Sequence, residues 1–367
     1  MTPFSTKTLI TSASTLAIAA TVWTFASAQE MVSELPPVVD QAGDIVQGGV
    51  ASIERVNLGG VEQTILIRTQ DTSLPVLLFL HGGPGGAIIP WIEFFHTPLL
   101  EENFTVVHWD QRGAGSSFST DLAVDDITPD LMIADTLELS NMLRDRFGQD
   151  KIFLAGQSWG SALGFLTLAQ DSSPFLGYIA ISERVAWNRS RQMSFDWAVA
   201  QAEANGDAEI LGQLHAVEPF DPIDEADLGV LGQAVDFYRG GDYHTPGLWD
   251  AILAYTMNGE SPYYTTAQVN SYIPGLELSS AAIERGEILS TYDLFKSFPT
   301  SDIPVHFITG TEDHNTTGDL AYEYFEVLEA PAKSFTWIEG AAHMVMMDQT
   351  DSWTEAMVDI KNQTLGQ

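Results

Sequence analysis

Residues 156–160 read Gly-Gln-Ser-Trp-Gly, and this motif constrains the fold more than any other part of the sequence. The apolar residues 151–155 before it predict a buried strand, and residues 161–170 after it predict a helix. A serine between two glycines at such a junction is typical of a turn so sharp that a Cβ two residues away on either side would clash. A chance glycine-rich loop is the alternative, but the flanking elements favour an exposed Ser158 hydroxyl beside the N–H of Trp159 and a helix N-terminus.

A serine is a weak nucleophile without a base, so one of the histidines is expected to act as the base for Ser158. With this kind of turn the acid and then the histidine follow the serine along the chain, which excludes the three histidines before residue 158. His306 lies inside a predicted strand and is expected to be a core residue. His343 follows the apolar strand 334–338 in a short loop, and the carboxyl ends of strands are where open parallel sheets place their sites. The sequence therefore predicts His343 as the general base.

The acid that orients this histidine is expected at the end of the preceding strand, residues 303–310. Asp313 is the better candidate, because the spacing Gly-x-x-Asp lets the chain turn at Gly310 before presenting the carboxylate. Glu312 is the alternative, and His314 is expected to be a loop neighbour. The carboxylate would hold the imidazole tautomer and stabilise the imidazolium without taking the proton itself.

A second glycine-rich loop, residues 81–86 (His-Gly-Gly-Pro-Gly-Gly), follows the predicted strand 75–80. Loops of this kind bring backbone N–H groups close to a substrate oxygen, so Gly83 is predicted to complete the oxyanion hole with Trp159. Gly82 is the alternative donor. A phosphate-binding loop is disfavoured, because the Lys-Ser/Thr ending that a nucleotide site needs is missing.

Five motifs occur in order: His81-Gly-Gly-Pro-Gly85, Trp109-Asp-Gln-Arg-Gly-Ala-Gly-Ser116, Gly156-Gln-Ser-Trp-Gly160, Gly310-Thr-Glu-Asp313 and Gly340-Ala-Ala-His343. Together they resemble the proline iminopeptidase (prolyl aminopeptidase) group of α/β-hydrolases, over residues 48–182 and 296–365. The resemblance implies an α/β fold with a mostly parallel central sheet, flanking helices and a helical cap inserted after the sixth strand. It implies a triad of Ser158, Asp313 and His343 with Gly83 and Trp159 as oxyanion donors. It also implies that Arg112 forms a buried ion pair, with Asp110 as the expected partner.

The resemblance further implies a serine hydrolase that releases N-terminal residues, preferably proline, from peptides through an acyl-enzyme. Family aminopeptidases hold the substrate ammonium with glutamates of the cap, some of them in tryptophan-rich stretches, and no clear W-x-x-W-E counterpart is present here. Glu183 and Glu260 are the candidates for that role. An esterase, lactonase or amidase on the same framework is the alternative. A catalytically silent binding protein is disfavoured by the complete set of motifs.

The N-terminus carries Lys7, an apolar run from Leu9 to Ala20 and the sequence Ala-Ser-Ala ending at Ala28. This pattern predicts a signal peptide over residues 1–28 and an exported protein, periplasmic or secreted; an uncleaved membrane anchor is the alternative. Residues 29–47 are predicted to be a tether. Residues 48–182 and 296–367 are assigned to the hydrolase core. Residues 183–295, which have helical runs and breakers but little β-type alternation, are assigned to the cap.

The chain has a formal net charge of −35, with 50 acidic and 15 basic residues, which disfavours nucleic acid and anionic membranes as partners. The charge is consistent with attraction of cationic substrates, although general solubility is the more ordinary explanation. The chain has no cysteine, which excludes disulfides and thiol chemistry. No metal-ligand motif is recognisable, so no metal or cofactor is expected, and the predicted partner is a small peptide or ester substrate.

Overall fold

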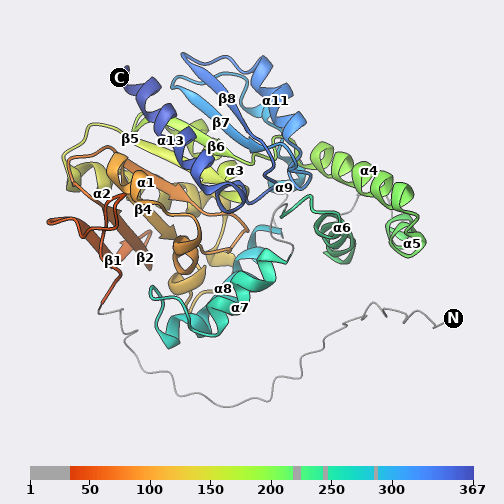
Figure 1. Ribbon diagram of the computed structural model, residues 1–367, viewed down its shortest axis with the longest axis horizontal. Helices are drawn as coiled ribbons and strands as arrows, with labels where there is room; N and C mark the ends of the chain where they lie inside the picture. Colours follow the sequence, from red (N-terminus) through yellow and green to blue (C-terminus); the bar gives the residue numbers. More distant parts are fainter. Residues whose placement is uncertain (1–33, 218–224, 243–246, 285–287) are drawn as a thin grey trace.

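A computed structural model describes residues 34–217, 225–242, 247–284 and 288–367. Its centre is an eight-stranded sheet in the order β1-β2-β4-β3-β5-β6-β7-β8 (Figure 1). Strands β1 and β2 pair antiparallel, as do β2 and β4, whereas β4, β3, β5, β6, β7 and β8 run parallel. The mostly parallel sheet that the sequence predicts is confirmed. The strands are β1 (Val50–Leu58), β2 (Val61–Thr69), β3 (Val76–Leu80), β4 (Thr105–Asp110), β5 (Ile152–Gln157), β6 (Phe175–Ile181), β7 (Val305–Gly310) and β8 (Lys333–Ile338).

Both faces of the sheet are covered, which explains why the central strands are apolar without alternation. In β3 every residue is buried; Leu78 and Leu80 belong to one hydrophobic cluster and Leu77 and Phe79 to another. This is the pattern of a parallel strand between two helical layers. On the first side lie α2 (Pro129–Phe147), α3 (Trp159–Gln170) and α11 (Gly318–Val327). On the second side lie α1 (Pro98–Asn103), α12 (Val345–Asp348) and α13 (Thr350–Leu365).

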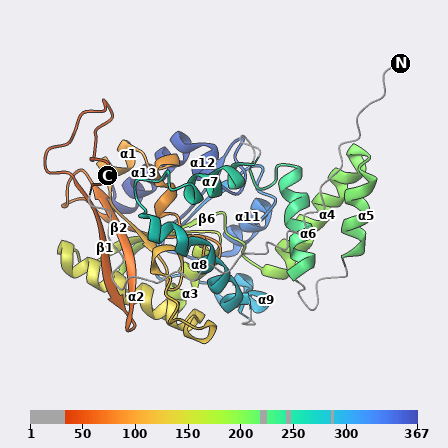
Figure 2. The same cartoon turned by 90° about the horizontal axis from the view of Figure 1, so that it is seen from below.

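Between β6 and β7 the described residues form helices and no further strand of the sheet, as expected for a helical insertion. Figures 1 and 2 show the first three of these helices grouped together at one end of the molecule, apart from α7 and α8. The group has its own small core, which includes Ala198, Leu214 and Leu231. The helices are α4 (Trp187–Asn205), α5 (Ala208–Ala216), α6 (Glu225–Phe237), α7 (Leu248–Met257), α8 (Thr266–Glu284), α9 (Ile288–Thr291) and α10 (Leu294–Ser297).

The segment predicted as a tether is, in its described part, packed against the sheet. Val38 is 3% exposed, and Val39 forms an antiparallel bridge with Ile45. The Arg68 guanidinium donates hydrogen bonds to the carbonyl oxygens of Pro36 (2.9 Å) and Pro37 (3.2 Å). The first residues of this segment, up to Val39, are therefore held against the protein, in part by a buried arginine of β2, whereas residues 41–45 are exposed.

The predicted signal peptide, residues 1–28, lies outside the described residues. Of the helices that the structure describes, none combines the length and the apolar character needed to cross a membrane.

Candidate active site

Ser158 lies at the tip of a strained turn between β5 and α3. Its backbone has φ 54° and ψ −117°, a conformation that a non-glycine residue adopts only where the surroundings enforce it. The two flanking glycines are required sterically. A Cβ on Gly156 would overlap the Gly160 carbonyl, and a Cβ on Gly160 would overlap the Leu80 carbonyl of β3. The sharp turn that the sequence predicts is therefore present, and it directs the serine side chain into a cavity.

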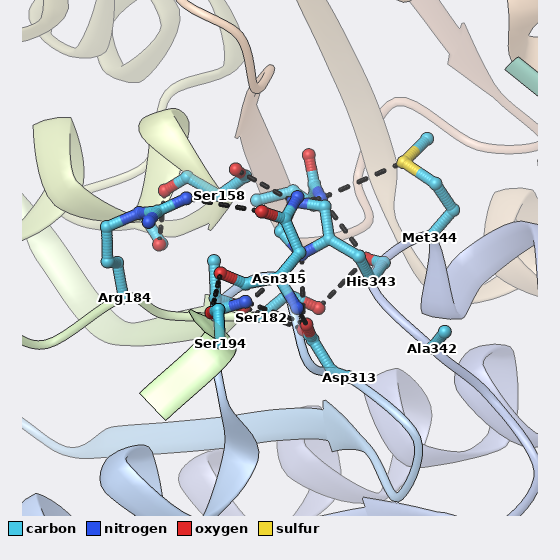
Figure 3. A network of polar contacts seen from close by, with 12 residues as sticks. Ser158, Ser182, Arg184, Ser194, Asp313, Asn315, Ala342, His343 and Met344 are labelled. Atoms are coloured by element: carbon cyan, nitrogen blue, oxygen red, sulfur yellow. Dashed lines mark hydrogen bonds and ion pairs between the residues drawn. The ribbon is translucent and has the colours of Figure 1, made fainter. Parts of the chain in front are cut away.

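His343 and Asp313 come to Ser158 from the ends of β8 and β7 (Figure 3). The Nε2 atom of His343 lies 2.9 Å from Ser158 Oγ, and its Nδ1 atom lies 3.1 Å from Asp313 Oδ2. The pairing of Gly310 with Ile338 aligns the ends of the two strands, so the loops that follow them meet. The structure thus brings together the serine, histidine and aspartate that the sequence singled out. The other acid considered, Glu312, is half-buried and does not line the cavity.

Asp313 is almost completely buried, yet it is held as a carboxylate. Burial alone would raise its pKa, but His343, the Thr316 N–H (2.9 Å) and the Thr316 hydroxyl (2.7 Å) more than compensate and lower it to about 2. The Asn315 N–H adds a further hydrogen bond of 3.0 Å to Oδ1. Both oxygens are therefore satisfied, and Oδ2 remains directed at the imidazole.

The remaining histidines have other surroundings. His306 is buried in β7 between the hydroxyls of Ser334 (2.7 Å) and Thr364 (3.2 Å), as expected for a core residue. His314 stacks on Trp197 with ring centroids 4.0 Å apart. His215 lies on α5, and His244 lies outside the described residues.

The glycine-rich loop after β3 lies beside Ser158. Gly82 and Gly83 line the same cavity as the serine, and a Cβ on Gly82 would come 3.2 Å from Ser158 Cβ. Trp159 is the first residue of α3, where backbone N–H groups have no acceptor within the helix. The Trp159 N–H is therefore available beside Ser158, and the backbone of Gly82 and Gly83 lies in the same cavity.

Gln111 connects three of the sequence motifs. Its backbone N–H donates to His81 Nε2 (3.2 Å), and its side-chain amide donates to the His81 carbonyl (3.0 Å). The indole N–H of Trp159 donates to Gln111 Oε1 (3.2 Å). Burial lowers the pKa of His81 to about 4, so its ring is neutral and can accept this hydrogen bond. The segment after β4 thus holds the glycine-rich loop against the serine turn.

Arg112 forms the buried ion pair expected of it, but with a different partner. Its Nε and Nη2 atoms lie 2.7 and 2.8 Å from the two carboxylate oxygens of Asp135 on α2. Asp110, the partner expected from the sequence, instead accepts hydrogen bonds from the backbone and hydroxyl of Ser116 and from the Tyr264 hydroxyl. The partner was mispredicted because Asp135 is remote in sequence.

A cavity of about 380 Å³ opens over Ser158, and its wall carries charges of both signs. The acids are Asp236 at the end of α6, Asp242 in the following segment and Asp250 on α7, and the cation is Arg184 after β6. Asp242 accepts a hydrogen bond from the Leu248 N–H (2.9 Å), and burial raises its pKa. The apolar part of the lining includes Ile88, Trp91, Leu248, Trp249, Ile252 and Met344.

Neither glutamate proposed from the sequence as an ammonium ligand lines this cavity. Glu183 is 1% exposed, and its Oε1 accepts hydrogen bonds from the Val185 N–H (3.0 Å) and the Tyr292 hydroxyl (3.0 Å). Glu260 is exposed after α7, where it accepts a hydrogen bond from Asn258. The expectation for both is corrected: Glu183 follows β6 as predicted, but its side chain turns into the protein.

Sequence reasoning missed four charged residues of the cavity wall. Arg184 is adjacent to Glu183, so the segment after β6 does reach the cavity, but with a cation in place of the predicted carboxylate. Asp236 and Asp242 flank the Gly240-Gly241 pair, and Asp250 lies on α7. That pair is bonded to the site, since the Gly240 and Gly241 carbonyls accept the backbone N–H groups of His314 (3.0 Å) and His343 (3.1 Å).

Within the described ranges, no group of three or more His, Cys, Asp or Glu side chains is arranged to hold a metal ion.

Comparison with known proteins places this site in a family. The model of the alpha/beta hydrolase fold family matches residues 75–350. A probable aminopeptidase of Bacillus subtilis (strain 168), YbaC, is 30% identical over 295 residues, which are 80% of this chain and 91% of that protein. The chain therefore belongs to the α/β-hydrolase fold family.

Within that family, this chain is similar to proline iminopeptidases. The enzyme of Lactobacillus delbrueckii subsp. lactis is 24% identical over 77% of this chain and 88% of its own length. The crystal structure of proline iminopeptidase from Mycobacterium smegmatis superimposes with a TM-score of 0.61 and 22% identity, over 85% of this chain and 98% of that one. Because the identity to the Mycobacterium smegmatis enzyme is only 22%, this structural similarity shows a shared fold.

Proposed function

We propose that this protein is an exported aminopeptidase of the proline iminopeptidase type, which releases an N-terminal residue, preferably proline, from short peptides. The names of its relatives support a peptidase. The observation that carries the proposal is the joint position of Ser158, His343 and three aspartates on one cavity. An N-terminal ammonium held by these aspartates would occupy the same cavity as the serine, as removal of an N-terminal residue requires.

In the proposed reaction, His343 Nε2 accepts the proton of Ser158 Oγ as the oxygen attacks the scissile carbonyl carbon. Asp313 holds Nδ1–H and stabilises the imidazolium. The N–H groups of Gly83 and Trp159 donate to the oxyanion. The imidazolium then protonates the leaving amine, an acyl-enzyme forms, and water activated by His343 hydrolyses it.

A substrate panel tests the reaction type and the residue preference. Prolyl, alanyl and arginyl p-nitroanilides are compared with p-nitrophenyl acetate and butyrate on the purified protein. The proposal expects the highest kcat/KM for the prolyl anilide among the amides. Turnover of the esters with no turnover of any aminoacyl anilide would replace it with the esterase, lactonase or amidase alternative.

The titration of Asp236 predicts how KM should depend on pH. Partial desolvation in the cavity, and next the charge of Asp242, raise its pKa to about 6. Below that pH the carboxyl is neutral and attracts an ammonium weakly, so KM for a free-amine anilide should fall as pH rises through about 6. Asp236→Asn should remove this fall and raise KM at pH 8 by about 10-fold or more, as expected for loss of a partly desolvated charge pair.

The control for this variant is Asp196→Asn, which removes an exposed carboxylate of α4 that does not line the cavity. It should retain the pH dependence of KM. An unchanged KM profile in Asp236→Asn would show that the ammonium is held elsewhere.

Export is supported by the signal-like pattern of residues 1–28. Expression of the full chain in a Gram-negative host, followed by N-terminal sequencing of the periplasmic fraction, should give a mature chain that begins at Gln29. An intact Met1 in the membrane fraction would indicate an uncleaved anchor.

A further inference from the structure

Arg184 lies at the carboxyl end of β6 and lines the cavity that contains Ser158. Figure 3 shows its guanidinium pointing toward Ser158 and Asn315. The group is held on two sides: it lies 4.4 Å from the centre of the Trp187 ring, and Nη2 donates a long hydrogen bond of 3.5 Å to Asn315 Oδ1. Because a planar guanidinium has five N–H donors, most of its donors are left for another acceptor.

The surroundings of Arg184 differ from those of four other arginines in the described part of the chain. Arginines 68, 112, 146 and 189 each form an ion pair with a carboxylate. No carboxylate of the described residues lies within ion-pair distance of Arg184, which faces the cavity; the charges of Asp313 and Glu183 act on it from further away. Burial lowers its pKa to about 10, so it remains charged at neutral pH while being poorly solvated. An anionic ligand would supply the missing partner.

We infer that Arg184 is the binding site for a substrate carboxylate, and that the preferred substrates are dipeptides with a free C-terminus. The inference rests on the proposed aminopeptidase function and narrows its substrate class. A guanidinium recognises a carboxylate with two parallel hydrogen bonds, a geometry that few other ligands of this charge satisfy as well.

The cavity supports this reading through its size and its two signs of charge. About 380 Å³ is near the lower end of ligand cavities in proteins, which suits a substrate of two residues better than a long peptide. A dipeptide carries an ammonium for the aspartates and a carboxylate for Arg184, with the scissile carbonyl between them. The carboxylate belongs to the leaving amino acid, so it would contribute to binding before acyl transfer and depart with the first product.

The test compares two substrates that differ in one charge, L-prolyl-L-alanine and L-prolyl-L-alanine amide. The wild type should show kcat/KM about 10- to 100-fold higher for the free acid, the range expected for a charge-assisted hydrogen-bonded pair. Arg184→Met should bring the ratio of the two values close to 1. Arg184→Lys, which keeps a point charge but loses the fork of donors, should give an intermediate ratio.

The ratio of kcat/KM for the free acid to kcat/KM for the amide distinguishes loss of carboxylate recognition from general damage to the site. Arg184 also contacts Asn315, next to the triad loop, so a purely structural role would lower kcat/KM for both substrates and leave the ratio unchanged. Arg189→Met is the matched control, because Arg189 is an exposed arginine of α4 paired with Glu323. It should retain the wild-type ratio. A wild-type ratio near 1, or a ratio unaffected by Arg184→Met, would overturn the inference.

A second substrate pair makes the result independent of the peptidase proposal. Acetoxyacetate and acetoxyacetamide are esters without an ammonium, and they differ in the same carboxylate on the leaving group. An Arg184-dependent preference for acetoxyacetate without peptide turnover would refute the aminopeptidase and keep the carboxylate site. Peptide turnover with no Arg184-dependent preference in either pair would refute the carboxylate site and keep the aminopeptidase.

Discussion

Ser158→Ala is expected to lower kcat for the best anilide substrate by about 10⁴- to 10⁶-fold. The hydroxyl is the nucleophile of the proposed reaction, and His343 Nε2 lies 2.9 Å from it. Without the nucleophile the remaining histidine and backbone donors have no acyl acceptor to activate, so their contributions are lost together. Steady-state rates of purified wild type and variant give the ratio.

The fold of Ser158→Ala should be unchanged. Alanine retains the Cβ, and both flanking glycines remain, so the backbone at φ 54° is not altered by the substitution. Thermal unfolding should give a Tm within a few degrees of the wild type, as is usual for a truncation outside the core. A variant that keeps kcat within 10-fold of the wild type would mean that the nucleophile is another residue.

Asp313→Asn is expected to lower kcat by about 10⁴-fold, because the amide can direct its NH₂ at Nδ1 and favour the tautomer that cannot accept the serine proton. The substitution also removes a stabilising charge. The pKa of Asp313 is about 2 in the folded protein against an ordinary 3.8, which corresponds to about 2 kcal/mol of folding free energy at neutral pH. Since the folded-state pKa is the lower one, this contribution is complete above about pH 4 and is lost as pH falls toward 2.

Glu312→Gln is the matched control for Asp313→Asn. It removes an adjacent, half-buried carboxylate that the sequence alone left as an alternative. Its kcat and its free energy of unfolding should stay close to those of the wild type. If Glu312→Gln were inactive and Asp313→Asn active, the orienting acid would have to be reassigned.

The parts of the fold and site that could be predicted share one property: they depend on short stretches of backbone. The turn at Ser158 needs glycine at 156 and 160 for local steric reasons, so five residues are enough to indicate it. The loops that carry Asp313 and His343 follow apolar strands whose ends must meet in a parallel sheet, and the order of the three residues then limits the choice. His306 was recognisable as a core residue for the same reason.

The errors concern contacts between residues that are remote in sequence. Arg112 binds Asp135 across the first helical layer, and Asp110 is already engaged by Ser116 and Tyr264. Glu183 and Arg184 are neighbours after β6, and the glutamate is held inward by hydrogen bonds from the Val185 N–H and from the hydroxyl of Tyr292, which is remote in sequence. The periodicity of apolar residues along the chain carries no information on which side chains pair across such distances.

The charged cavity wall is the clearest example. Asp236, Asp242 and Asp250 belong to an insertion whose helices have weak sequence signals, and their shared position depends on how those helices lie over the sheet. An acidic composition spread over the whole chain gave no means of choosing three aspartates among 50 acidic residues.

The central claim is that this hydrolase acts on substrates with a free N-terminus, and N-acetylation tests it most directly. The measurement is kcat/KM of the wild-type protein for L-prolyl p-nitroanilide and for N-acetyl-L-prolyl p-nitroanilide at pH 8. Loss of a partly desolvated ammonium–carboxylate contact is worth about 2–4 kcal/mol, so the free amine should be preferred by about 30-fold or more. Equal values for the two anilides, or a preference for the acetylated one, would contradict the aminopeptidase assignment.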